Sequence, residues 1–232
     1  MIFEPFGEQG QKKLSQSTAL ICGCGALGGS IAQILVRSGI GTLRLVDFDV
    51  VSLDNLHRQF LFTEDDAAQK RFKVEAATQT LRQGNSTVRI ETFTDRFSEH
   101  NADRLLENVD ILIDATDHFE MRFLLNKTAL RKNLPLVTGG INGTCGQVMT
   151  IIPGRTPCLS CLLDPQTPPN ATPVFPVLSP IVQVISAYQA MEAIKILSGN
   201  LESINRSLVK FDLWTNQVKF ISLGNLLPCR CR

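Results

Sequence analysis

Polar residues suited to handling phosphate groups gather between positions 47 and 73 of this sequence. The set comprises two carboxylates, two amides and two cations: Asp47, Asp49, Asn55, Gln59, Arg58 and Lys73. Arginine offers a phosphate two parallel N–H donors and lysine offers a point charge, whereas a carboxylate can hold the Mg²⁺ that accompanies a polyphosphate. This combination favours chemistry on a nucleoside triphosphate over hydride transfer, which has no use for it.

A glycine-rich turn lies about 20 residues upstream of this region. Gly23, Gly25 and Gly28 form a Gly-x-Gly-x-x-Gly pattern between a predicted strand over residues 17–22 and a predicted helix over residues 30–38. Glycines at these positions permit a tight turn, close approach of the backbone to a phosphate and close packing of helix on strand. The helix N-terminus also favours an anion. The pattern predicts a nucleotide here, and the alternative is a tight turn without a ligand.

The next predicted strand, residues 42–46, ends at Asp47. An acidic side chain at this position can accept hydrogen bonds from a ribose, although NAD and ATP both carry that ribose. A solvated carboxylate at the end of a strand is the alternative. Strand, glycine turn, helix and strand make one βαβ unit, in which we expect parallel strands and a right-handed crossover.

Apolar periodicity predicts the remaining elements. Helices are expected over residues 66–83, 102–108, 121–132 and 180–197, strands over residues 87–93, 110–114, 136–138 and 147–152, and a hairpin over residues 207–213 and 217–223. The fold class is therefore α/β: a Rossmann-like sheet with helices on both faces, a long crossing loop over residues 154–180 and a C-terminal β-hairpin, in one domain over residues 1–232. Ligands bind beyond the carboxyl ends of such strands, so Gly23, Asp47 and Asp117 should converge on one crevice.

Composition narrows the function classes. With a net charge of +1 over 232 residues and no block of lysine and arginine, the chain gives no sign of nucleic acid as its main ligand. It has no run of about 18 apolar residues that would predict a membrane span. The N-terminus lacks the basic and apolar regions of a signal peptide. These features predict a cytoplasmic protein with reduced thiols.

Four motifs carry a resemblance to a known family. They are the glycine pattern, Val46-Asp47-Phe48-Asp49 with Asn55-Leu56-x-Arg58-Gln59, Lys73-Val74-Glu75-x-Ala77, and Ala115-Thr116-Asp117. From about Gly7 to Cys231 the chain resembles the ThiF/MoeB/HesA family, the bacterial relatives of ubiquitin-activating enzymes. The resemblance implies a homodimeric adenylyltransferase that uses ATP and Mg²⁺. Its substrate would be the C-terminal glycine carboxylate of a small ubiquitin-like sulfur-carrier protein ending in Gly-Gly, and pyrophosphate would be released.

The resemblance also implies roles for individual residues. Gly23, Gly25 and Gly28 would form the nucleotide turn, Asp47 would hold the ribose, and the crossing loop over residues 154–180 would arch over the carrier's tail. The other members of the nucleotide-binding set would be Asp49, Asn55, Arg58, Gln59, Lys73 and Asp117.

Three of these residues are the expected catalytic groups. Arg58 and Lys73, together with Asn55, would contact the phosphates, and Asp117 would bind Mg²⁺. The two cations would stabilise the charge that develops at the α-phosphorus when the carrier's carboxylate attacks it. Lys70 is the alternative to Lys73, which the Lys-Val-Glu-x-Ala string favours.

The seven cysteines are clustered. Cys158 and Cys161 have the Cys-x-x-Cys spacing of a zinc knuckle. In the family a second pair lies near the C-terminus, where this chain has Cys229 and Cys231, so a structural Zn²⁺ held by these four thiolates is expected. Free thiols at each pair are the alternative. Of the other three, Cys22 is expected in a strand core, Cys24 is expected to be partly exposed in the turn, and Cys145 is expected to be structural and not reactive.

Two departures from the family pattern bear on activity. Many members carry a cysteine in the crossing loop, but residues 171–177 contain none, so no covalent step is expected there. The family also supplies an N-terminal arginine to the partner subunit's ATP site, whereas the first arginine here is Arg37 and only Lys12 and Lys13 precede the first strand. Adenylation needs no enzyme nucleophile, and the missing arginine affects its rate more than nucleotide binding.

The residues leave three other functions open. One is activation of a different carboxylate, on a peptide or on a modified tRNA base. The near-neutral charge of the chain argues against tRNA. Another is a nucleotide-binding, weakly catalytic scaffold that recruits a ubiquitin-like partner, against which the retention of Arg58, Lys73 and Asp117 argues. The last is an NAD-dependent oxidoreductase, for which the sequence offers no clear acid–base pair.

Overall fold

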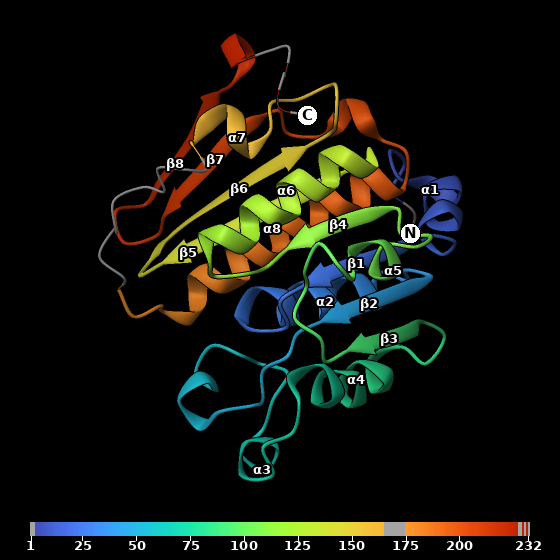
Figure 1. Ribbon diagram of the computed structural model, residues 1–232, viewed down its shortest axis with the longest axis vertical. Coiled ribbons are helices and arrows are strands. Elements are labelled where there is room, and N and C mark those ends of the chain that lie inside the picture. The colour runs from blue at the N-terminus through green and yellow to red at the C-terminus, as the bar shows by residue number, and fades with distance from the viewer. Residues whose placement is uncertain (1–2, 165–174, 227–228, 230, 232) are drawn as a thin grey trace.

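The protein is built on a twisted sheet of eight strands, which runs diagonally through Figure 1. The computed structural model describes residues 3–164, 175–226, 229 and 231. The strands are β1 (Thr18–Cys22), β2 (Thr42–Val46), β3 (Arg89–Phe93), β4 (Ile111–Asp114), β5 (Leu136–Asn142), β6 (Cys145–Ile151), β7 (Ser207–Asp212) and β8 (Gln217–Ser222). They lie in the order β3-β2-β1-β4-β5-β6-β7-β8. The first five strands in that order, from β3 through β1 to β5, are parallel to one another. The pairs β5–β6, β6–β7 and β7–β8 are antiparallel.

Helices cover both faces of the sheet, as the sequence predicts. They are α1 (Gly7–Leu14), α2 (Ala26–Arg37), α3 (Glu64–Ala68), α4 (Lys73–Gly84), α5 (Ala102–Leu105), α6 (Phe119–Lys132), α7 (Leu159–Leu162) and α8 (Ser179–Leu197). Apolar residues of α2, α4 and α8 share one buried core with the sheet, and those of α5, α6 and α7 share the other. Figure 1 shows α6 and α8 on opposite faces of the central strands. In the part of the chain described, no helix is long and apolar enough to cross a membrane.

The central strand β1 is apolar on both sides because both of its faces are covered. Ala19 and Ile21 belong to the core beneath α2 and α8, whereas Leu20 belongs to the core beneath α6. Strand β2 pairs with one side of β1, and β4 pairs with the opposite side of β1. The carboxyl ends of β1 and β4 therefore flank a topological switch point, where α/β sheets bind their ligands.

The predicted helix over residues 66–83 is wrong in one respect, because the chain forms two helices there. Lys70 has a φ of 50°, which breaks the helix between α3 and α4. The backbone N–H of Lys73 donates to the carbonyl oxygen of Asp49 at 2.9 Å. This bond holds the first residue of α4 against the loop that follows β2.

Smaller differences concern the ends of elements. The helix predicted over residues 102–108 is shorter, and Asn108 adopts a φ of 56° that a helix does not accommodate. The strand predicted over residues 136–138 continues to Asn142, because all seven residues of β5 pair with β6. The C-terminal hairpin is confirmed, with Asn216 in its turn at a φ of 56°. Helices α1 and α7 were not predicted.

The crossing loop predicted over residues 154–180 is exposed at Gly154 and Arg155 but packs into the protein directly after them. Thr156, Cys158 and Leu159 are all buried. The hydroxyl of Thr156 accepts from the N–H of Ile152 at 2.8 Å, which fastens the start of this segment to the end of β6. Residues 165–174 lie outside the described residues, and with them part of the stretch that lacks a cysteine.

Candidate active site

The glycine turn joins β1 to α2 and brings the helix N-terminus to the switch point. Gly23 has a φ of 93°, and a Cβ there would lie 2.8 Å from the carbonyl oxygen of Ala115. A Cβ on Gly28 would overlap the carbonyl oxygen of Gly23, so the helix can touch the turn only with glycine at this position. Gly25, the N-cap of α2, supplies no side-chain cap. The first N–H groups of α2 can therefore bind an anion such as a phosphate.

Asp47 follows β2 directly and holds the glycine turn in place. Its carboxylate oxygens accept from the N–H of Cys24 at 2.6 Å and the N–H of Asp49 at 2.8 Å. Burial raises the pKa of Asp47, and these hydrogen bonds and the charge of Lys73 oppose that rise. The predicted position of this carboxylate, beside the glycine turn, matches the structure, whereas its contact with a ribose remains a prediction.

The expectation that Cys24 is partly exposed is wrong. Its side chain turns inward beneath α4, where its sulfur lies 4.0 Å from the carbonyl oxygen of Lys73. Burial raises the pKa of the Cys24 thiol far above its usual range, so this thiol is inert. Cys22 is buried in β1, as predicted, and Cys145 is exposed at the start of β6.

Lys73 is a buried cation at the first position of α4. Its Nζ donates to Oδ2 of Asp49 at 2.8 Å, and the lysine side chain is 8% exposed whereas that of Asp49 is 50% exposed. Lys70 is fully outside this arrangement, because its side chain is exposed at the bend before α4. Of the two lysines that the sequence left as alternatives, only Lys73 is therefore held beside Asp49.

Arg58, Asn55 and Gln59 lie on the 3₁₀ turn after β2 and the loop that follows it. The Arg58 guanidinium donates to Oδ1 of Asn55 at 2.6 Å. The Gln59 side chain is buried, with Nε2 3.4 Å from where a Cβ on Gly25 would lie, and its Oε1 has no hydrogen-bond partner among the described residues. A buried, unsatisfied acceptor beside the glycine turn can be satisfied by an N–H or O–H group of a ligand.

Asp117 lies in the loop after β4, and its side chain is 91% exposed. Its Oδ1 lies 3.4 Å from Nε2 of His118. Ala115, two residues earlier, contacts the backbone of Gly23, so this loop borders the glycine turn. Gly23, Asp47 and Asp117 therefore lie at one edge of the sheet, and an exposed carboxylate there is accessible to a cation.

Sequence reasoning missed Arg122, which lies on the first turn of α6. Its guanidinium donates to the carbonyl oxygen of Thr116 at 2.9 Å. A Cβ on Gly140 would lie 2.5 Å from Nη1, so the guanidinium rests on the backbone of β5. The buried Nε has no partner among the residues that the structure describes. The signal available in the sequence was the glycine pair at positions 139 and 140, which leaves room for a large side chain above the strand.

The four cysteines near the crossing loop and the C-terminus form a cluster. Their sulfur atoms all lie within 4.8 Å of one another, and the Cys161 sulfur lies 3.8 Å from Cys158, 3.4 Å from Cys229 and 3.7 Å from Cys231. Four sulfurs around a tetrahedral Zn²⁺, each at about 2.3 Å from it, lie about 3.8 Å apart. The geometry therefore fits zinc, and the Cys-x-Cys spacing at the C-terminus does not prevent the fit.

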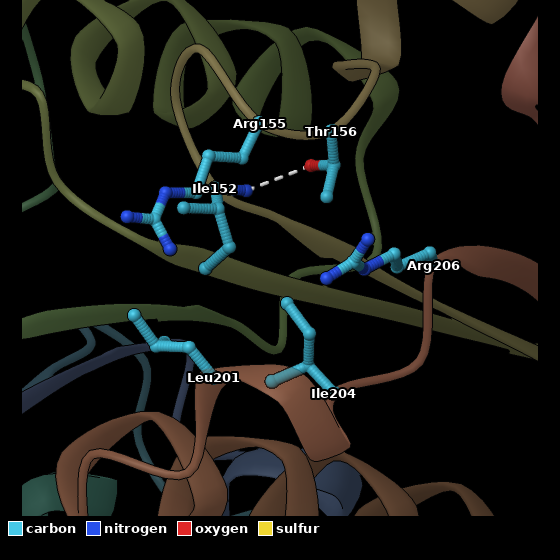
Figure 2. A pocket seen from close by; sticks show the side chains of 6 residues that line it. All are labelled: Ile152, Arg155, Thr156, Leu201, Ile204 and Arg206. Carbon is cyan, nitrogen blue, oxygen red and sulfur yellow. Dashed lines mark hydrogen bonds between the residues drawn. The ribbon is translucent and has the colours of Figure 1, made fainter.

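A cavity of about 220 Å³ lies at the other edge of the sheet. Figure 2 shows the residues that line it: Ile152, Arg155, Thr156, Leu201, Ile204 and Arg206. Ile152 follows the last residue of β6, which pairs with the first residue of β5. The cavity is therefore separated from the glycine turn by the length of the parallel strands, and it is not part of the crevice.

The sequence as a whole matches one protein family. The model described as the ThiF family matches residues 1–232. The chain belongs to the ThiF family. It is therefore an adenylyltransferase, the activity after which several ThiF-family relatives are named.

Curated ThiF-family relatives match almost all of the chain. The "Sulfur carrier protein ThiS adenylyltransferase" of Bacillus subtilis (strain 168) is 37% identical over 231 residues, which cover 99% of this chain and 68% of the relative. "Protein HesA" of Nostoc sp. (strain PCC 7120) is 36% identical over 220 residues, 95% of this chain and 85% of the relative. The maize "Adenylyltransferase and sulfurtransferase MOCS3-1" is 34% identical over 232 residues, and this chain spans only 49% of its length.

Solved structures confirm the ThiF-type fold. The crystal structure of MccB from Escherichia coli with ATP superposes with a TM-score of 0.83 at 25% identity, covering 96% of this chain and 68% of MccB. The complex of MccB with MccA-N7isoASN also gives a TM-score of 0.83, at 24% identity, and covers 96% of this chain and 69% of that chain. The mixed eight-stranded sheet is thus the fold of this group of structures.

Proposed function

We propose that the chain uses ATP to adenylate the C-terminal glycine carboxylate of a small ubiquitin-like sulfur-carrier protein. The observation that carries this proposal is the meeting, at one sheet edge, of an uncapped helix N-terminus, the buried cation Lys73 and the exposed carboxylate Asp117. The Bacillus subtilis relative, named for adenylation of the sulfur carrier ThiS, supports the substrate class.

The proposed reaction requires cations beside the phosphates of ATP. A carboxylate oxygen of the carrier attacks the α-phosphorus of ATP, and the bond from that phosphorus to the bridging oxygen breaks, so that pyrophosphate leaves with the electron pair. Negative charge grows on the leaving group and on the α-phosphate oxygens. Lys73 and Arg58 are the cations for this charge, and Asn55 orients the Arg58 guanidinium through its 2.6 Å hydrogen bond.

The nucleotide would be held by the groups around the glycine turn. The first N–H groups of α2 suit a phosphate, Asp47 suits the ribose, and the unsatisfied oxygen of Gln59 suits a hydroxyl or amino group. Asp117 would hold Mg²⁺, which supplies neutralisation of the phosphate charge. The exposure of Asp117 supports this role because Mg²⁺ keeps several of its waters when bound.

An apolar surface at the end of the sheet suits the folded part of the carrier. The outermost strand, β8, exposes Val218 and Phe220, and the adjoining turn exposes Trp214. Because β7 runs parallel to β5, this turn lies at the same edge of the sheet as the glycine turn. Four strand spacings of about 4.8 Å separate β8 from β4, roughly 19 Å, which about six extended residues cover. A carrier on β8 could therefore place a flexible tail of that length in the crevice.

The four-cysteine cluster would hold a structural Zn²⁺. Cys158 and Cys161 lie in the first part of the crossing loop, and Cys229 and Cys231 lie near the C-terminus. An ion bound by all four would tie these two segments together. Structural zinc sites of this kind contribute directly to folding.

Another apolar surface, formed by the segment between β2 and α4, suits contact with a second copy of the chain. Phe48, Leu53 and Phe60 are each at least half exposed there. We place the homodimer contact on this segment. Light scattering after size exclusion tests it: Leu53→Lys and Phe60→Lys should give monomers where the unmodified chain gives dimers. A monomeric unmodified chain at every concentration would refute the contact.

Pyrophosphate exchange tests the proposed reaction. The full chain is incubated with ATP, Mg²⁺ and radiolabelled pyrophosphate, with or without a ubiquitin-like carrier ending in Gly-Gly. Exchange that depends on the carrier, and is lost when the carrier's last glycine is deleted, is the expected result. Exchange with a peptide and not with any carrier would instead favour another carboxylate substrate, and ATP binding without any exchange would favour the recruiting scaffold.

A further inference from the structure

Asn126 is a buried polar residue in the middle of α6 that the proposed reaction does not use. Its side chain is 1% exposed. Oδ1 accepts from the N–H of Leu159 at 3.0 Å, and Nδ2 donates to the hydroxyl of Ser160 at 3.1 Å. Both ends of this amide are therefore bonded to α7, the short helix that begins directly after Cys158 and contains Cys161.

The two residues bonded to this amide stand directly beside cysteines of the cluster, because Leu159 follows Cys158 and Ser160 precedes Cys161. Four thiolates around one divalent ion carry a net negative charge, which N–H donors around the sulfurs stabilise. The Ser160 hydroxyl accepts from the Asn126 amide and, within the part of the chain described, makes no hydrogen bond to a cysteine sulfur.

Helix α6 connects this amide to the crevice. Arg122 lies one turn before Asn126 on the same helix, about 6 Å along its axis. Its guanidinium is bonded to the carbonyl oxygen of Thr116, and α6 begins two residues after Asp117. One helix therefore carries a group bonded to the turn between Cys158 and Cys161 and a group bonded to the edge of the crevice.

We propose that Asn126 is a positioning residue of the metal site: it retains the metal on the four cysteines and links metal occupancy, through α6, to nucleotide binding. The inference rests on the proposed zinc site. Residues that bond to the ligands of a metal typically change its affinity 10- to 100-fold when replaced. Asn126 acts one residue further out, because it bonds to the residue after the ligand Cys158 and to the residue before the ligand Cys161, and so fixes the turn that presents both sulfurs.

Metal retention by the full chain tests the proposal. Zinc-loaded protein is titrated with a chromogenic chelator, and the released Zn²⁺ is measured. Asn126→Asp keeps an acceptor for the Leu159 N–H but places a negative oxygen against the turn that carries Cys158 and Cys161, so zinc affinity should fall about 10- to 100-fold. Ser160→Ala, the matched control on the same loop, should stay within about 3-fold of the unmodified chain. Equal zinc affinity of Asn126→Asp and the unmodified chain would overturn the proposal.

Two further measurements separate a binding role from a folding defect and from failure of the zinc assignment. Metal-free Asn126→Asp and metal-free unmodified chain should melt at similar temperatures, and added zinc should raise the melting temperature of the variant less. The unmodified, zinc-stripped chain should bind ATP more weakly than the loaded chain and recover on reloading. Unchanged ATP affinity after stripping would overturn the link through α6. An unmodified chain that binds no zinc would overturn the zinc site itself.

Discussion

The ammonium group of Lys73 and the carboxylate of Asp49 form a 2.8 Å ion pair in which the cation is buried and the anion is half exposed. A buried cation without a partner is costly, so Asp49 keeps the charge of Lys73 balanced from the solvent side. A phosphate that enters from the same side can take over that role. Lys73 can thus exchange the carboxylate of Asp49 for a phosphate, and its buried positive charge stays paired with an anion throughout.

Replacing this buried cation should remove adenylation. We expect Lys73→Gln to lower pyrophosphate exchange by about 100-fold or more, the usual cost of removing a preorganised group that stabilises developing charge. Lys70→Gln, a matched control three residues away on the exposed bend, should keep its activity. The reverse pattern would reassign the phosphate contact to Lys70.

Asp117 and Arg58 should be needed for activity and dispensable for folding. Both side chains lie outside the cores, so Asp117→Ala and Arg58→Ala should keep the circular dichroism spectrum and melting temperature while abolishing exchange. Asp103→Ala, which removes another exposed carboxylate, serves as the control. Full activity of either site variant would remove that residue from the proposed set.

The contact between Gly23 and Gly28 should make the latter intolerant of any side chain. A Cβ at position 28 overlaps the Gly23 carbonyl oxygen, so α2 would have to move away from β1. We expect Gly28→Ala to lower the free energy of unfolding in urea by about 1–3 kcal/mol. Gly29→Ala is the matched control, because its Cβ would meet only the flexible side chain of Leu61, at 3.4 Å. Equal stability of the two variants would contradict the contact.

Removal of zinc should destabilise the protein. A loss of a few kcal/mol corresponds to about 5–10 °C for a chain of this size, at about 2–4 °C per kcal/mol. A chelator should therefore lower the melting temperature of the unmodified chain, and Cys161→Ser should show the lower value with or without chelator. Cys145→Ser, which alters an exposed thiol outside the cluster, should behave like the unmodified chain.

The capping box of α3 should make stability depend on pH. Burial acts to raise the pKa of Asp66, but hydrogen bonds from Thr63 and the charge of Arg71 outweigh it, so the pKa is lowered. A carboxyl group with a lowered pKa in the folded state adds stability above its unfolded value of about 3.9, and this is lost as the pH falls through the folded value. Asp66→Asn should therefore cost about 1 kcal/mol near pH 7 and less near pH 3, measured by urea unfolding. An equal cost at both values would contradict the assignment.

Local patterns predicted the first βαβ unit closely. The strand expected over residues 42–46 is β2, because an alternating apolar segment between Gly41 and Asp47 has clear ends. The break at Lys70 was not predictable in the same way. Lysine has no preference for a positive φ, and the bend is imposed by the hydrogen bond from Lys73 to Asp49, which joins segments that lie far apart along the chain.

The parts of the candidate site that sequence reasoning missed depend on packing between distant segments. Arg122 belongs to the crevice because β5 presents Gly140 beneath it. Cys24 is buried because the first turn of α4 covers it. The order of the strands, and therefore which loops are neighbours, determines both facts, and neither a motif nor a periodicity in one segment contains that information.

The placement of β4 beside β1 also governs when the protein can recognise a nucleotide during its synthesis. The N–H of Thr18 donates to the carboxylate of Asp110, a partner 92 residues further along the chain. A nascent chain of which only the glycine turn and β2 have emerged from the ribosome still lacks β4, the strand that supports the other side of the crevice. ATP therefore cannot guide the early steps of folding, and it stabilises the chain only once the central strands have assembled.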